Sequence, residues 1–141
     1  MTVLLDLNVV LDSLLGREPW RAEADTIWDA NRDGRIAAQM TAAALPTLFY
    51  VVRKQEDQAR AHLAVANCLR SLGIVPVDRS ALELATTLPG SDFEDNLQIA
   101  CAMEACLDAI VTRNPKDFVG SSVPVLTPAE LLALLAKAAD A

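Results

Sequence analysis

The sequence has few cysteines and only one histidine. Its three cysteines, Cys68, Cys101 and Cys106, are odd in number and show neither a disulfide framework nor the spacing of a metal site. Each lies within a helix-like apolar stretch, so we expect buried, free thiols. His62 lies in the middle of a predicted helix, where we expect it at the surface or in helix packing rather than in catalysis.

Long hydrophobic runs are also missing. No apolar stretch approaches the roughly 20 residues that a membrane-spanning helix needs, and the first residues, MTVLLDLNVV, have neither a basic segment nor a small-residue cleavage site. We therefore expect a cytoplasmic protein without a membrane segment. No internal repeat, low-complexity tract or linker divides the 141 residues, of which 52% are hydrophobic. The prediction is a single domain over residues 1–141.

Positive charge is scarce. The chain has 12 Lys and Arg against 19 Asp and Glu, which gives a net charge of -7 at pH 7. A protein that binds nucleic acid by bulk electrostatics needs a basic surface, because its cationic side chains neutralise phosphates. If nucleic acid is the substrate, the contact must therefore be local. The excess of carboxylates would be explained if some of them bind a divalent metal ion.

Short β-branched runs alternate with longer helical patterns along the chain. Strands are predicted at residues 2–6, 35–39, 74–77, 108–112 and 123–126. Helices are predicted near residues 8–15 and 20–31, as one or two segments over 41–72, and at 79–87, 92–106 and 128–139. This alternation favours a three-layer α/β/α sandwich with a central, mainly parallel sheet of about five short strands.

Asp6 ends the first predicted strand, in VLLDLNVV. In an open α/β sheet, ligands bind in the crevice outside the carboxyl ends of the strands, so the Asp6 carboxylate is expected to point into that crevice. Asp is also a favoured N-cap residue, and Asp6 could instead cap the next helix. Asn8, two residues on, could serve as the cap and free Asp6.

Three carboxylates open the helix predicted at residues 92–106, in SDFEDNLQIACAMEA. Ser91 and Glu94 match the capping-box pattern. Asp92 suits either the positive end of the helix dipole or an outer metal ligand. Asp95 shares a helix stripe with Ile99, Ala102, Met103 and Cys106, which we expect to pack on the sheet. A carboxylate on that face needs a cation or a cage of hydrogen bonds, and a divalent ion shared with Asp6 would supply one.

A further polar cluster follows the strand predicted at 108–112, in TRNPKDF. Thr112, Asn114 and Asp117 would lie along the same sheet edge as Asp6, and Arg113 and Lys116 would add positive charge there. The alternative is a polar turn that Phe118 closes against the core.

Four segments in this order resemble the PIN-domain family, in the branch with a DFED...TRNxxDF signature. They are LLDLNVVLDSLLGREP, LFYVVRK, DFEDNLQIACAMEACLDAIVTRNPKDF and VPVLTPAEL. The resemblance implies a small α/β/α fold. Many members are divalent-metal-dependent ribonucleases, and many bacterial members are VapC-like toxins that a small antitoxin neutralises.

The resemblance also implies roles for single residues. It makes Asp6 the first metal-binding acid and Asp95 the later helix acid. Asn114 falls where many members have a fourth acid, and Asp117 could partly compensate for it. The customary second acid falls at Thr47 in the best alignment, so two of four customary acids are changed.

We therefore expect RNA hydrolysis that depends on Mg²⁺ or Mn²⁺ held by Asp6 and Asp95. Asp92, Asp117 and Asn114 would complete the catalytic site, and Thr112, Arg113 and Lys116 would contact the RNA. The expected partners are a small antitoxin and a second copy of the chain. The alternative is a degenerate PIN domain that binds RNA or protein and has weak or no nuclease activity.

Overall fold

The computed structural model describes residues 1–140 and contains a five-stranded sheet in the order β3-β2-β1-β4-β5. The strands are β1 (Thr2–Leu5), β2 (Ala37–Thr41), β3 (Gly73–Val75), β4 (Ala109–Val111) and β5 (Val125–Leu126). All four strand pairings are parallel. The predicted parallel α/β fold is confirmed. The second strand begins two residues later than predicted, because Arg35 and Ile36 still donate backbone hydrogen bonds to Ala30 of the preceding helix.

Residues 1–140 form seven α-helices, six of them between strands and one after the last strand. They are α1 (Leu7–Leu14), α2 (Arg21–Arg32), α3 (Ala44–Gln55), α4 (Gln58–Ser71), α5 (Arg79–Thr87), α6 (Phe93–Glu104) and α7 (Pro128–Ala139), and a short 3-10 helix, η1, covers Pro115–Asp117. The segment predicted as one or two helices over 41–72 forms two. Asp57 separates them, because its side chain accepts the backbone N–H of Arg60 at 2.7 Å and so caps α4.

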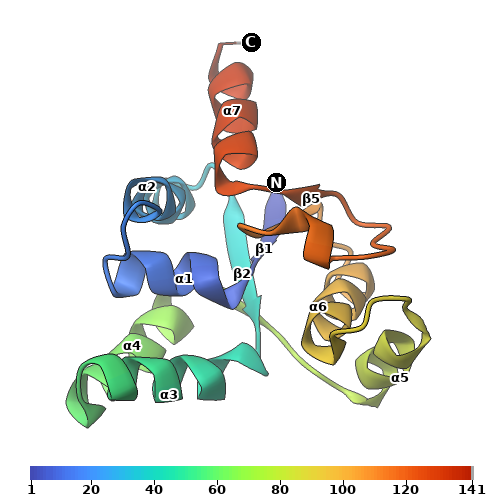
Figure 1. Cartoon of the computed structure of the whole chain (residues 1–141). Coiled ribbons are helices and arrows are strands. Elements are labelled where there is room, and N and C mark those ends of the chain that lie inside the picture. Colours follow the sequence, from blue (N-terminus) through green and yellow to red (C-terminus); the bar gives the residue numbers. More distant parts are fainter. Residues whose placement is uncertain (141) are drawn as a thin grey trace.

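The helices cover both faces of the sheet. Figure 1 shows α1 to α4 on one side of the strands and α5 and α6 on the other, with α7 extending from the edge. Side chains alternate between the two cores: Val3 and Leu5 face the α1–α4 side, and Leu4 faces the α5–α6 side. Because both faces are covered, the central strands are almost continuously apolar, as the sequence pattern indicated.

The cysteine prediction is wrong for one residue. Cys68 and Cys101 are buried, but Cys106 is exposed and has a φ of +54°. Helix α6 ends at Glu104 rather than at the predicted residue 106, so Cys106 leaves the buried stripe. His62 is exposed and its ring lies 4.9 Å from that of Phe49, which agrees with the expected packing of helix on helix.

Over residues 1–140, none of the helices has the length and apolar character required to span a bilayer.

Candidate active site

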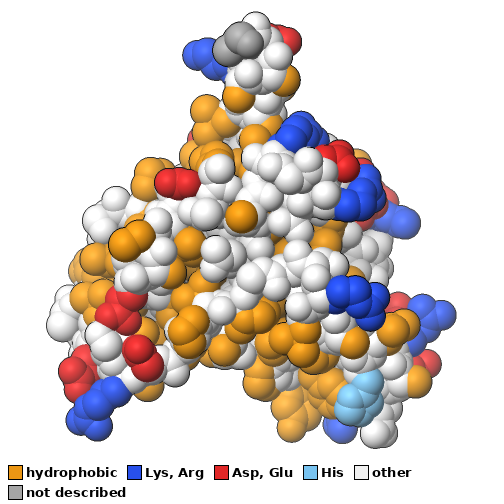
Figure 2. Space-filling view, turned by 180° about the vertical axis from the view of Figure 1, so that it is seen from behind, with side chains coloured by type: hydrophobic (Ala, Val, Ile, Leu, Met, Phe, Trp, Pro, Cys, Tyr) orange, Lys and Arg blue, Asp and Glu red, His pale blue; other side chains and the backbone are white. Residues whose placement is uncertain are grey.

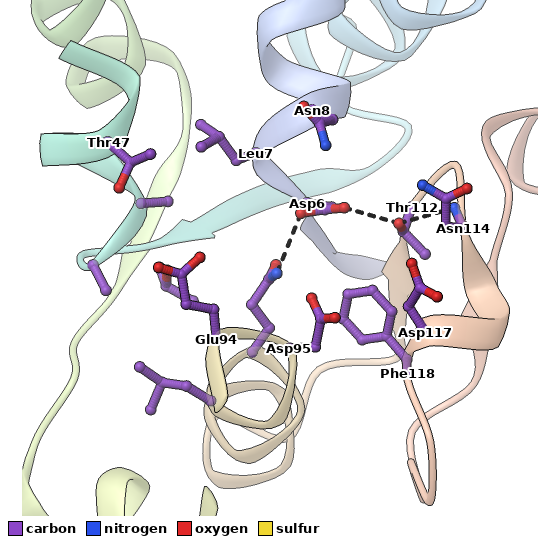
Figure 3. Close-up of a pocket in the computed structure, with 15 residues that line it drawn as sticks. Asp6, Leu7, Asn8, Thr47, Glu94, Asp95, Thr112, Asn114, Asp117 and Phe118 are labelled. Atoms are coloured by element: carbon purple, nitrogen blue, oxygen red, sulfur yellow. Dashed lines mark hydrogen bonds between the residues drawn. The ribbon is translucent and has the colours of Figure 1, made fainter. Parts of the chain in front are cut away.

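A cavity of about 220 Å³ opens at the carboxyl edge of the sheet. The ends of β1, β2 and β4 form its floor, and α3, α6 and the turn after β4 form its walls (Figure 3). Its lining residues are Asp6, Leu7, Asn8, Thr41, Ala43, Ala44, Thr47, Glu94, Asp95, Leu97, Gln98, Thr112, Asn114, Asp117 and Phe118. Parallel strands all end at one edge, which is why residues more than 100 positions apart meet here.

Asp6 occupies the N-cap position of α1, but its side chain does not cap the helix. Only its backbone carbonyl accepts helix N–H groups, from Val9 at 3.0 Å and Val10 at 3.4 Å. The carboxylate turns into the cavity, where Oδ2 accepts the Thr112 hydroxyl at 2.8 Å and Oδ1 accepts the Gln98 amide at 3.2 Å. The capping alternative for the Asp6 side chain is therefore wrong.

Asn8 is not the cap either. It lies in the first turn of α1, and its side-chain oxygen accepts a hydrogen bond from Arg17 at 3.3 Å. A helix begun by the backbone of Asp6 alone leaves the Asp6 carboxylate available for the cavity.

Thr112 is fully buried at the end of β4 and connects two parts of the site. Its hydroxyl donates to Asp6 and accepts the backbone N–H of Asn114 at 3.2 Å. Gln98, which was not predicted, holds the other oxygen of Asp6 from α6. It follows Asp95 by three positions, so both project from one face of the helix. That spacing was the available signal in the sequence.

Helix α6 starts differently from the prediction. Asp92, not Ser91, is the N-cap, and its side chain accepts the backbone N–H of Asp95 at 3.1 Å. The Ser91–Glu94 capping box is therefore wrong. Asp and Ser cap equally well, and the same spacing one residue later places the cap at Asp92. Asp92 lies outside the cavity lining, while Glu94 and Asp95 project from α6 into the cavity (Figure 3).

The cavity concentrates negative charge. Asp6, Glu94, Asp95 and Asp117 line it, and none of the described lining residues is Lys, Arg or His. Burial is the largest cause of a raised pKa at Asp95, followed by the charges of Asp92, Asp6, Asp117 and Glu94 in that order, and together they raise it from 3.8 to about 6. The cavity therefore disfavours another ionised carboxylate and favours a cation.

The side chains present fit a hard cation that uses oxygen ligands. Within residues 1–140, no three His, Cys, Asp or Glu side chains lie close enough together to form a metal site by themselves. Mg²⁺ commonly uses only one or two carboxylates and completes its coordination with water and substrate phosphates. Asp6 and Asp95 can supply two carboxylates, and the oxygens of Asn114 and Asp117 line the same cavity.

Thr47 lines the cavity from α3, where the resemblance placed an acid. Its exposed hydroxyl leaves that wall uncharged. The structure thus brings Thr47 into one cavity with Asp6, Asp95, Asn114 and Asp117.

Arg113 does not reach the cavity. Its Nε lies 3.0 Å from Oδ2 of Asp12, which is only 1% exposed, and its guanidinium lies 3.8 Å from the ring centroid of Trp20. Burial raises the pKa of Asp12, although Arg113 and Arg17 oppose the shift. Lys116 is exposed on η1 and is also outside the lining. Neither cation contacts the site as the sequence suggested, because consecutive residues after β4 point in different directions.

Comparisons with known proteins identify a family and solved structures of similar fold. The model of the PIN domain matches residues 2–116. DNA-bound VapBC from Salmonella typhimurium is similar in structure, with a TM-score of 0.70 and 16% identity over 91% of this chain and 98% of that chain. A toxin-antitoxin complex from Klebsiella pneumoniae is similar with a TM-score of 0.65 and 21% identity, over 89% of this chain and 97% of that chain. The sarcin-ricin-loop-cleaving toxin VapC20 from Mycobacterium tuberculosis is similar with a TM-score of 0.63 and 12% identity, over 77% of this chain and 86% of that chain. No curated protein matches the sequence significantly.

Proposed function

Because the chain belongs to the PIN-domain family, we propose that it is a ribonuclease that depends on a divalent metal ion and acts as the toxin of a toxin-antitoxin pair. The observation that carries the proposal is the cavity in which four carboxylates meet without a cation from the lining residues. Such a cavity repels the scissile phosphate from its centre unless a metal ion is bound, so cleavage should require the metal.

Asp6 and Asp95 are the proposed ligands of Mg²⁺ or Mn²⁺, with Asn114 and Asp117 as further oxygen donors, directly or through water. When bound, the ion supplies the positive charge that polarises the scissile phosphodiester and makes water a better nucleophile. Thr112 and Gln98 hold the two oxygens of Asp6 in place. Without these two donors the Asp6 side chain would be free to change rotamer.

The cavity walls support this chemistry. Leu7, Leu97 and Phe118 line it with apolar surface, which lowers the local dielectric and strengthens each charge interaction. Asp92 acts indirectly in this proposal, since it caps α6 and so fixes the backbone of Asp95.

A small antitoxin and a second copy of the chain are the proposed protein partners. Exposed apolar side chains would suit such contacts. Figure 2 shows them gathered over the corner formed by α3 and α4, where Leu63 and Leu69 are 57% and 56% exposed. The toxin-antitoxin complex among the structural neighbours supports the antitoxin.

A binding module without catalysis is the second candidate. Thr47 and Asn114 favour it, because both line the cavity at positions where the family commonly has acids. In this case the fold would bind RNA or protein, and the cavity would bind metal weakly or not at all.

Cleavage of a mixed RNA pool distinguishes the two. The wild type should cleave with Mg²⁺ or Mn²⁺ and stop when EDTA is added, and Asp6→Ala and Asp95→Ala should be inactive. Asp29→Ala, which removes an exposed carboxylate on α2, is the control and should cleave normally. Equal cleavage by all four proteins would overturn the metal site. RNA binding without cleavage, together with no heat of metal binding in calorimetry, would favour the binding module.

A further inference from the structure

Two arginines, Arg17 and Arg113, lie near the cavity on its α1 side. Arg17 donates a hydrogen bond from Nη1 to Asn8, which lines the cavity. Arg113 lies in the chain between Thr112 and Asn114, which both line it. The opposite rim, at the start of α6, has the exposed acids Asp92 and Glu94. A polyanion bound across the cavity is therefore attracted toward α1 and repelled from α6.

Trp20 lies on this cationic side. Its ring is stacked with the Arg113 guanidinium, 3.8 Å from the ring centroid, and Trp20 remains 39% exposed. Arg113 is itself fixed by the buried carboxylate of Asp12. The chain therefore holds an exposed indole in a defined orientation against Arg113, the residue that follows the cavity-lining Thr112. Trp28, the other tryptophan, has its indole nitrogen buried.

The two arginines, Arg17 and Arg113, differ in how strongly Asp12 neutralises them. Asp12 pairs with Arg113 at 3.0 Å, whereas Arg17 is 3.9 Å away from Asp12 and its side chain is 29% exposed. Arg113 is thus largely neutralised, and Arg17 has charge and hydrogen-bond donors left for a ligand. Single-stranded nucleic acids commonly bind where an aromatic ring and a partly exposed guanidinium lie in one cluster, with a base on the ring and a phosphate on the cation.

We propose, building on the ribonuclease function above, that Trp20 and Arg17 form a subsite for single-stranded RNA. A base next to the scissile phosphodiester stacks on the exposed part of Trp20, and a neighbouring phosphate contacts Arg17. Because every base offers a stacking face, the subsite selects single strands rather than a particular sequence. It gives a chain of net charge -7 the local contact that it needs to hold RNA.

Tryptophan fluorescence tests binding without any cleavage. In a Trp28→Phe background, Trp20 is the remaining tryptophan. A mixed-sequence 12-nucleotide RNA, added in EDTA, should quench its emission, and an abasic oligonucleotide with the same number of phosphates should quench it far less. Equal quenching by both, or by neither, would overturn the stacking. Double-stranded RNA should quench weakly, and quenching as strong as that by the single strand would contradict the selection of single strands.

Cleavage kinetics test the role in the reaction. Trp20→Leu should raise KM for the 12-nucleotide RNA by about 5- to 100-fold, the range expected for one lost base stack, with kcat nearly unchanged. Trp20→Phe should restore most of the affinity because it keeps a ring. Arg17→Gln should reduce the salt dependence of binding by about one phosphate contact. Leu82→Ala, which truncates an exposed apolar side chain on α5, is the matched control and should change nothing.

The two proposals fail in different ways. If the wild type cleaves RNA and Trp20→Leu has an unchanged KM, the subsite is wrong and the ribonuclease stands. If the wild type cleaves no RNA, fluorescence quenching by RNA but not by the abasic chain still supports the subsite. Thermal unfolding of each variant identifies any loss that comes from misfolding, and the fluorescence experiment needs no substitution at Trp20.

Discussion

Replacing Asp95 by Asn should stabilise the metal-free protein at pH 7 while it abolishes cleavage. Burial and four neighbouring carboxylates raise the pKa of Asp95 to about 6, compared with 3.8 in an unperturbed chain. Between about pH 4 and pH 6 the folded state therefore binds more protons than the unfolded state. The stability of the wild type consequently falls as the pH rises through this window. Asn cannot ionise and avoids this loss.

The size of the effect follows from the two pKa values. Their difference, at about 1.4 kcal/mol for each pKa unit, gives an upper limit of about 3 kcal/mol. Asp95 is partly exposed, so solvent screening reduces this value. Asn also loses a favourable charge in the first turn of α6, worth about 0.3 to 1 kcal/mol. The expected net stabilisation is about 1 to 2 kcal/mol at pH 7 and close to zero at pH 4.

Urea denaturation in EDTA at pH 4 and pH 7 measures this difference. Asp29→Asn, on the exposed face of α2, controls for the chemical change itself. Adding Mg²⁺ at pH 7 should then stabilise the wild type but not Asp95→Asn, because only the wild type has the carboxylate for the ion. A variant that is less stable than the wild type at pH 7, or a gain of equal size at both pH values, would refute the reasoning.

Three further substitutions test other parts of the site. Thr112→Val keeps the side-chain shape but removes the hydroxyl that donates to Asp6. The free energy of unfolding in urea should fall by about 1 to 3 kcal/mol, and the cleavage rate should fall with it. Unchanged values would contradict the role of this hydrogen bond. Arg113→Ala leaves the buried Asp12 without its partner and should cost about 3 to 5 kcal/mol, and a loss below about 1 kcal/mol would show that the pair is dispensable. Thr47→Glu adds a carboxylate to the α3 wall and should tighten Mg²⁺ binding in calorimetry, whereas weaker binding would place that wall too far from the metal.

The fold was largely predictable from the sequence. Strands β1 and β4 are buried on both faces, with Leu4 and Ile110 on one side and Leu5 and Val111 on the other, so their apolar runs identify the strands without any tertiary information. Helix starts were less predictable. Ser91 and Asp92 are both suitable N-cap residues at equivalent spacing, and in the structure Asp92 is the cap of α6. Position 106 was misassigned for a related reason, because the pattern continued past the residue where the helix ends.

For the site, the sequence by itself indicated that Asp6 and Asp95 would line one crevice. One ends a strand and the other lies on the sheet-facing side of a helix, and parallel topology brings both positions to one edge. Only the tertiary structure decided the directions of the remaining polar side chains. Thr112 turns into the cavity toward Asp6, while Arg113 turns away to the buried Asp12, a residue that no sequence pattern singled out. Local patterns fix where a residue lies along an element, but the partner it contacts depends on packing between segments that are distant in the chain.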